Sequence, residues 1–248
     1  KLYEWLNANC LRMSHYPYAE EVYDLCDRMG IVVIDETPAV GIGAGPACDP
    51  YQTFPLKTYH SAVLRAMIEH FPESARDYWR PLYEQAHTQD PQDRPVTMVC
   101  CQNDYTKDIT TRTMDVVCIN RYYGWYNLSG DLDNAAYAFK KELDFWETID
   151  KPLILSEYGA DTVAGMHGFA PEMFTEEFQV EYYRTINGCL DERRFVVGEW
   201  PWNFADFSTQ QGPMRVGSCN RKGLFTRERT PKLAAHYFRD RWGKKEPN

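Results

Sequence analysis

Short runs of apolar residues alternate along this chain with longer stretches in which apolar side chains recur every three or four positions. A short apolar run bounded by Pro or Gly is typical of a buried strand, and the longer spacing predicts an amphipathic helix. The pattern predicts six strands, over residues 9–15, 31–38, 96–101, 116–120, 152–157 and 195–200. It predicts helices over residues 18–29, 56–70, 74–88, 132–149, 174–190 and 231–241, and loops over 41–55 and 203–230.

Strands that alternate with helices through short loops predict parallel β/α units, and therefore an α/β fold of the (β/α)8 barrel type. The alternation fails once, where two predicted helices meet at His70-Phe71-Pro72 without a strand between them. Right-handed β/α connections need a strand at such a point. We also expect one strand to precede Lys1, so the prediction is a single domain over 1–248 that is a barrel with six of its eight strands. Whether six strands close a narrower barrel or form an open sheet stays open.

The composition of the chain indicates which classes of partner and cofactor to expect. The net charge is −9 and the pI about 5.2, which argues against nucleic acid or an anionic membrane as a partner. No apolar run approaches the ~18 residues of a membrane span. Eight Cys are scattered without a C-x-x-C pair, which favours buried thiols in a reducing compartment over disulfides or zinc. With no signal-like start, we expect a cytoplasmic protein without metal or organic cofactor. A homo-oligomer is compatible with this sequence.

Acidic residues follow several predicted strands. The clearest case is the run from Pro152 to Asp161, in which four apolar residues lead directly into Glu157. In a parallel barrel that residue lies at the carboxyl end of its strand, where barrel enzymes carry their catalytic groups. Taken alone, Glu157 is either a structural ion-pair partner or a catalytic carboxylate. His15, at the end of the first predicted strand, is likewise either a structural histidine or a site residue.

Motifs at the strand ends resemble those of family 2 glycoside hydrolases, and more narrowly the β-glucuronidases of that family. The similarity is collinear over residues 5–242. Its motifs are Ser14-His15-Tyr16-Pro17-Tyr18, Ile34-Asp35-Glu36-Thr37, Asn120-Arg121-Tyr122-Tyr123-Gly124-Trp125-Tyr126, Glu157-Tyr158-Gly159-Ala160-Asp161-Thr162 and Trp202-Asn203-Phe204-Ala205-Asp206-Phe207.

The resemblance implies a retaining mechanism with two carboxyl groups about 5–5.5 Å apart, of which one attacks the anomeric carbon and the other protonates the leaving oxygen. Glu157 matches the nucleophile, and Tyr123 is expected near its carboxylate. The substrate is a small-molecule glucuronide. The substrate-binding residues that the resemblance implies are His15, Asn120, Tyr122, Tyr123, Tyr126, Trp202, Arg215, Asn220 and Lys222.

Substrate choice depends on charge, because a glucuronide carries a carboxylate that Arg can bind in a bidentate manner and Lys as a point charge. Asn220-Arg221-Lys222 resembles the Asn-x-Lys signature with which β-glucuronidases recognise that carboxylate. Arg215 matches a further sugar-site residue. Without the resemblance, Arg221 and Lys222 would be solvated loop charges. A β-galactosidase or galacturonidase of the same family is the alternative enzyme.

One expected motif is absent. The family's acid/base glutamate belongs to an Asn-Glu-Pro motif after the fourth strand, and this chain contains no Asn-Glu-Pro. Its place is the junction at His70-Phe71, so no acid/base residue is found. Glu69 and Glu73 fit helix surfaces better, and Glu36 and Glu199 match structural positions. The absence keeps open a non-catalytic remnant, a truncated pseudoenzyme that at most binds sugar.

Overall fold

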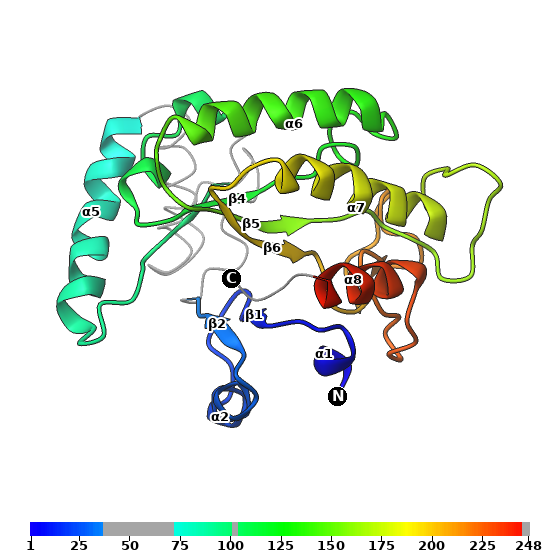
Figure 1. Ribbon diagram of the computed structural model, residues 1–248, viewed down its shortest axis with the longest axis horizontal. Helices are drawn as coiled ribbons and strands as arrows, with labels where there is room; N and C mark the ends of the chain where they lie inside the picture. The colour runs from blue at the N-terminus through cyan, green and yellow to red at the C-terminus, as the bar shows by residue number, and fades with distance from the viewer. Residues whose placement is uncertain (37–71, 101–103, 245–248) are drawn as a thin grey trace. The chain divides into compact units, whose positions relative to one another are not determined.

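The computed structural model describes residues 1–36, 72–100 and 104–244 (Figure 1). The chain divides into two compact units, one formed by Lys1–Ala8 with Cys118–Asn248 and the other by Asn9–Val117. The predicted α/β class is confirmed, with parallel strands that alternate with helices, as in an incomplete barrel.

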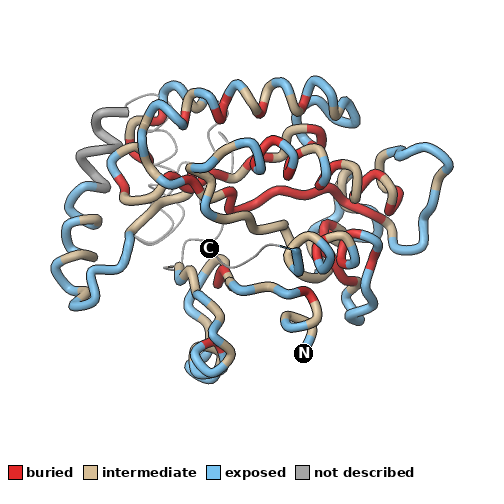
Figure 2. The backbone as a smooth tube through the Cα atoms, viewed as in Figure 1, coloured by how far each residue is buried: buried red, intermediate tan, exposed pale blue. Residues whose placement is uncertain are grey.

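A sheet forms the core of the larger unit. Strands β4 (Val117–Asn120), β5 (Leu153–Tyr158) and β6 (Val196–Pro201) are neighbours in that order, and β5 and β6 run parallel. Every residue of β5 except Ile154 is buried, as the red tube in Figure 2 shows. A strand buried on both faces must be apolar almost throughout, which explains why its sequence signal is so clear.

Three long helices complete this unit. They are α6 (Leu132–Glu147), α7 (Glu176–Asp191) and α8 (Leu233–Gly243), and α7 packs against both of the others (Figure 1). The side chains of Asp131 and Thr175 accept the backbone N–H groups of residues 134 and 178, each at 3.1 Å. These N-caps satisfy donors that a helix start leaves unpaired, and they fix where α6 and α7 begin.

Two short features of the larger unit have no counterpart in the hydrophobic pattern. Helix α1 (Leu2–Trp5) spans four residues. The predicted loop 203–230 contains strands β7 (Phe207–Ser208) and β8 (Cys219–Asn220), which pair antiparallel. Two-residue strands are too short for a periodic signal, so this pairing could not be predicted from the pattern.

The second unit begins with a β/α/β element that matches the prediction. Strand β1 (Cys10–Arg12), helix α2 (Glu20–Met29) and strand β2 (Val32–Ile34) follow one another, and the two strands pair in parallel. Gly30 ends α2 with φ +66°, a left-handed conformation that glycine adopts without steric cost.

The remaining described elements of the second unit are also short, apart from one helix. They are α5 (Pro72–Gln89), β3 (Val99–Cys100) and two 3-10 turns, Tyr105–Lys107 and Thr111–Thr113. Strand β3 is shorter than the predicted run 96–101. The predicted loop 41–55, the predicted helix 56–70 and Glu69 lie outside the described residues.

Two buried cysteines test the interpretation of the thiols. Cys26 in α2 and Cys189 in α7 are free and buried, and burial raises the pKa of Cys189 to about 11. For these two residues the prediction of buried thiols is confirmed. Within the described ranges, no helix has both the length and the hydropathy that a membrane crossing requires.

A histidine of α5 lies between two carboxylates. The His87 ring nitrogens contact Asp93 Oδ1 at 2.7 Å and Asp115 Oδ2 at 2.9 Å. The hydrogen bond to Asp93 raises the pKa of His87, and Asp115 adds to the effect, while desolvation opposes it. A raised pKa in the folded state means that charged His87 stabilises the protein fully below its unfolded pKa of about 6.5, and that this contribution disappears as pH rises through the folded pKa.

We therefore expect His87→Gln to lower the melting temperature more at pH 5.5 than at pH 8.5, because glutamine cannot carry the charge. The measurement is the difference in melting temperature between wild type and variant across that pH range. Taking the difference cancels the pH dependence that arises from titrating groups common to both proteins. A difference that stays constant with pH would contradict the pairing.

Candidate active site

Glu157 is the fifth residue of β5, beside the carboxyl end of the strand, as predicted. The residue is buried, with 8% of its surface exposed. Its backbone carbonyl accepts the N–H of Arg121 at 2.9 Å, and its carboxylate accepts the Tyr122 hydroxyl at 2.8 Å. The strand therefore fixes the backbone of Glu157 while the Tyr122 phenol orients its carboxylate.

The two adjacent tyrosines donate to different carboxylates. The Tyr122 hydroxyl donates to Glu157, and the expected place of Tyr123 near that carboxylate stays a prediction. The Tyr123 hydroxyl donates to Glu142 of α6 at 2.9 Å. Burial, together with the nearby Glu157 charge, raises the pKa of Tyr122 well above its usual value, so the phenol stays protonated and can donate.

Glu142 holds the segment that carries these tyrosines. Its carboxylate, which is fully buried, accepts Arg121 Nε at 2.8 and 2.7 Å and the Trp146 indole N–H at 2.8 Å. A second guanidinium nitrogen of Arg121 lies 2.6 Å from the same carboxylate. Arg121 is also buried, so the pair fixes the backbone immediately before Tyr122.

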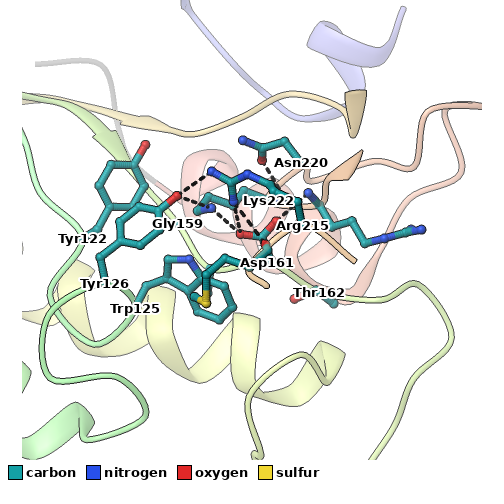
Figure 3. A network of polar contacts seen from close by, with 12 residues as sticks. Tyr122, Trp125, Tyr126, Gly159, Asp161, Thr162, Arg215, Asn220 and Lys222 are labelled. Atoms are coloured by element: carbon teal, nitrogen blue, oxygen red, sulfur yellow. Dashed lines mark hydrogen bonds and ion pairs between the residues drawn. The ribbon is translucent and has the colours of Figure 1, made fainter. Parts of the chain in front are cut away.

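A cationic cluster lies close to Tyr122 (Figure 3). The Lys222 ammonium, fully buried, pairs with the carboxylate of Asp161 and donates to the Tyr126 hydroxyl at 3.0 Å. The centroids of the Tyr126, Trp125 and Tyr122 rings are 4.8, 5.3 and 5.8 Å from Lys222 Nζ. Aromatic faces attract a cation, so one anion and three rings surround this ammonium.

Arg215 is the second cation of the cluster. Its guanidinium lies 3.2 Å from Asp161 Oδ2 and donates to the Tyr126 hydroxyl at 2.7 Å. Its side chain is 22% exposed, so this cation can be reached from solvent. Two of the predicted substrate-binding residues, Arg215 and Lys222, therefore meet at one carboxylate and one phenol of the protein itself.

A second buried ion pair, between Lys232 and Asp206, fixes the loop that carries Lys222. Lys232 donates to Asp206 and to the Arg221 carbonyl, both at 2.8 Å. Burial lowers the pKa of Lys232, and the Asp206 charge opposes that shift. Gly223 approaches Asp206 so closely that a Cβ there would lie 2.3 Å from the Asp206 nitrogen. Only glycine fits at this contact.

The other predicted residues of this unit are placed as follows. Asn220 Oδ1 accepts the Lys222 backbone N–H at 3.2 Å. Asn120 Oδ1 accepts the Ser156 hydroxyl at 2.7 Å, beside Glu157 along the strand. The backbone N–H of Trp202 donates to the Tyr158 carbonyl at 2.8 Å. Asn220 is therefore two positions from Lys222 in the chain. Asn120 and Trp202 each contact a residue next to Glu157, namely Ser156 and Tyr158.

His15 belongs to the second unit. Its Nδ1 lies 3.2 Å from Glu36 Oε2, and Glu36 also pairs with Arg12. Burial would raise the pKa of Glu36, but hydrogen bonds from His15 and Arg12 outweigh it and hold that pKa below its usual value. The predicted structural position of Glu36 agrees with these contacts.

Glu199 also has the structural position that was predicted for it. Its carboxylate accepts Arg241 Nε at 2.8 Å and the Trp242 indole N–H at 2.9 Å, which ties β6 to α8. Glu73 is the second residue of α5, a helical position as expected.

Four residues that hold the candidate site together were given no role in the sequence analysis. They are Asp161, Glu142, Asp206 and Lys232. Asp161 had a usable signal, because it is an acid four residues after Glu157 and just past the strand end. The contacts of Glu142 with Arg121 and of Lys232 with Asp206 join residues 21 and 26 positions apart in the chain, and such pairs leave no local pattern.

The chain matches the family model "Glycosyl hydrolases family 2, TIM barrel domain" in two stretches, residues 1–75 and 72–246. The two matches meet beside the junction at His70-Phe71-Pro72, where the strand pattern predicts a missing strand. The β-glucuronidase of the cat, Felis catus, is 43% identical over 263 aligned positions that cover 98% of this chain and 40% of the relative. Because that alignment is longer than the 248 residues of the chain, the relative contains residues that this chain lacks.

Solved structures give the same result. A Faecalibacterium prausnitzii β-glucuronidase has a TM-score of 0.89 and 60% identity, covering 99% of this chain and 44% of the other. A Bifidobacterium dentium β-glucuronidase in complex with coumarin-3-O-glucuronide has a TM-score of 0.85 and 52% identity, covering 99% and 42%. The chain spans about two fifths of the length of these relatives. With the family model matched over nearly all of its residues, the chain belongs to glycosyl hydrolase family 2, to the TIM barrel domain of that family.

Proposed function

We propose that this chain is the catalytic barrel of a retaining hydrolase of β-D-glucuronides, with Glu157 as the nucleophile. The observation that carries the proposal is the cluster of Lys222, Arg215 and Tyr126 in the same unit as Glu157. Tyr122 links the two, because its hydroxyl contacts Glu157 and its ring lies 5.8 Å from Lys222 Nζ. The Tyr122 side chain therefore lies between the Glu157 carboxylate, which its hydroxyl contacts, and the Lys222 ammonium, which lies near its ring.

The cluster is suited to a substrate carboxylate. The Tyr126 hydroxyl accepts hydrogen bonds from both Lys222 and Arg215, so its own proton is available to an acceptor, and Tyr126 is 44% exposed. Arg215 adds further N–H donors in a planar fork that matches carboxylate geometry. The B. dentium relative, which binds a coumarin glucuronide, supports the same substrate class.

In the proposed reaction Glu157 attacks the anomeric carbon, the bond to the aglycone oxygen breaks, and a glycosyl ester forms on the carboxylate. Water then hydrolyses the ester, which returns the original anomeric configuration. Tyr122 remains a neutral donor, and its hydrogen bond orients the Glu157 carboxylate for the attack. The strand supplies the rigidity that keeps the attack distance short.

The test is hydrolysis of 4-nitrophenyl β-D-glucuronide, compared with the β-D-glucoside and β-D-galactoside. We expect turnover of the glucuronide, and we expect Lys222→Met to reduce its kcat/KM by about 10²-fold, since loss of a buried charged partner costs about 2–5 kcal/mol. Turnover of neutral glycosides should be unchanged. Lys141→Met, which removes an exposed lysine of α6, is the matched control. Equal losses on charged and neutral substrates would contradict carboxylate recognition.

A second candidate function is sugar binding without turnover. It is favoured by one observation, the absence of an Asn-Glu-Pro motif for the acid/base glutamate. Loss of a general acid costs about 10²–10⁴-fold in rate, and the cost falls mainly on substrates whose leaving group needs a proton. Binding of a glucuronide analogue without hydrolysis of even the nitrophenyl substrate would select this function.

A further inference from the structure

Asp161 has an unusual position for an acidic residue in a site proposed to bind an anion. It follows the Glu157 strand and is 1% exposed. One of its oxygens, Oδ2, contacts both the Lys222 ammonium and the Arg215 guanidinium. Its other oxygen accepts the backbone N–H of Arg221 at 2.7 Å. A single carboxylate thus holds the side chains of two cations and the backbone beside one of them (Figure 3).

The charge balance of the cluster follows from these contacts. Two buried or half-buried cations face one carboxylate, so the cluster keeps a single net positive charge. That charge matches one carboxylate of a ligand. Without Asp161, two like charges would share a site of low dielectric and repel each other. Each would then move toward water, and neither would stay at the Tyr126 hydroxyl.

Two roles of Asp161 are therefore distinguishable. As a competitor, it would occupy the cations and weaken binding of a ligand carboxylate. As a positioning residue, it would hold the cations side by side and strengthen that binding. The burial of Asp161, together with its third contact to the Arg221 backbone, favours the second role, because those contacts fix its carboxylate away from a place that a ligand could take.

We propose that Asp161 is the positioning residue of the carboxylate-binding cluster, holding Lys222 and Arg215 in the arrangement that distinguishes uronic acids from neutral sugars. The inference depends on the proposed function, since it assigns a role within the same site. It concerns ligand preference, and a merely structural residue would affect charged and neutral ligands alike.

The test measures binding, which needs no catalytic acid. The ligands are uronic deoxynojirimycin and deoxynojirimycin, two iminosugars that differ by a carboxylate in place of a hydroxymethyl group. Calorimetric titration of wild type and Asp161→Asn gives the ratio of the two Kd values for each protein. We expect wild type to prefer the uronic ligand, and Asp161→Asn to reduce that preference by at least about tenfold with little change for the neutral ligand.

A preference that is unchanged or increased in Asp161→Asn would overturn the inference and leave the proposed function intact. Absence of any preference in wild type would instead reject the proposed function. Asp161→Asn leaves a buried ammonium without its anion and can fail to fold. In that case Lys222→Met, which lacks the buried ammonium, is compared with the double variant Lys222→Met/Asp161→Asn. Without Asp161, Arg215 loses its carboxylate partner, so the preference for the uronic ligand that Lys222→Met retains should be lost in the double variant. A preference that is unchanged or increased there would overturn the inference.

Discussion

Glu142→Gln should lower the free energy of unfolding by about 3–5 kcal/mol, the usual effect of removing one partner of a buried ion pair. Glu142 accepts hydrogen bonds from Arg121, Tyr123 and Trp146. An amide at this place turns a donor toward groups that are all donors themselves. It also removes the Glu142 charge from the buried Arg121 guanidinium. Urea-induced unfolding of wild type and variant gives the difference directly.

The matched control is Glu147→Gln, at the exposed end of the same helix. Glu147 lies 3.4 Å from Arg193, and its side chain is 52% exposed. Exposed pairs of this kind contribute about 0–1 kcal/mol. If the two variants lost similar stability, Arg121 would have found another anion, and the anchoring role of Glu142 would be wrong. Because Arg121 precedes Tyr122, we also expect Glu142→Gln to reduce the rate of glucuronide hydrolysis.

The elements that could be predicted from the sequence are those with a strong local signal. The strand of Glu157 is buried on both faces, so its apolar run is nearly continuous. Helix α2 has its stop at Gly30, where the left-handed φ requires a residue of this kind. The β7–β8 pairing has no such signal, because each strand contributes only two residues.

The sequence predicted several residues of the candidate site, but not which of them contact one another. Motif similarity selected Glu157 and Lys222 as candidates, but it did not predict that the Tyr122 hydroxyl donates to Glu157. It also passed over Asp161, whose role depends on Lys222, a residue 61 positions away in the chain. Contacts over such distances are set by how the loops pack, which hydrophobic periodicity does not encode.

The missing acid makes the choice of leaving group decisive for the nucleophile. A nitrophenolate leaves without protonation, so its glucuronide partly bypasses the acid. On that substrate we expect Glu157→Gln to reduce kcat by roughly 10³–10⁶-fold, the range that removal of a nucleophile causes in hydrolases. Glu199→Gln, which removes a strand-end carboxylate bound by Arg241, should keep its turnover per folded molecule.

Loss of activity in Glu157→Gln alone would not separate a nucleophile from an acid. In Glu157→Ala the side chain leaves space beside the anomeric carbon, and added azide can enter it. Azide would form a bond to that carbon while the bond to the nitrophenolate breaks, so a β-glucuronide would give an α-glucuronosyl azide by a single inversion. Recovery of turnover with this product identifies Glu157 as the nucleophile. A β-configured azide would place Glu157 on the leaving-group side, as the acid/base residue, because an enzyme with its nucleophile intact still inverts twice.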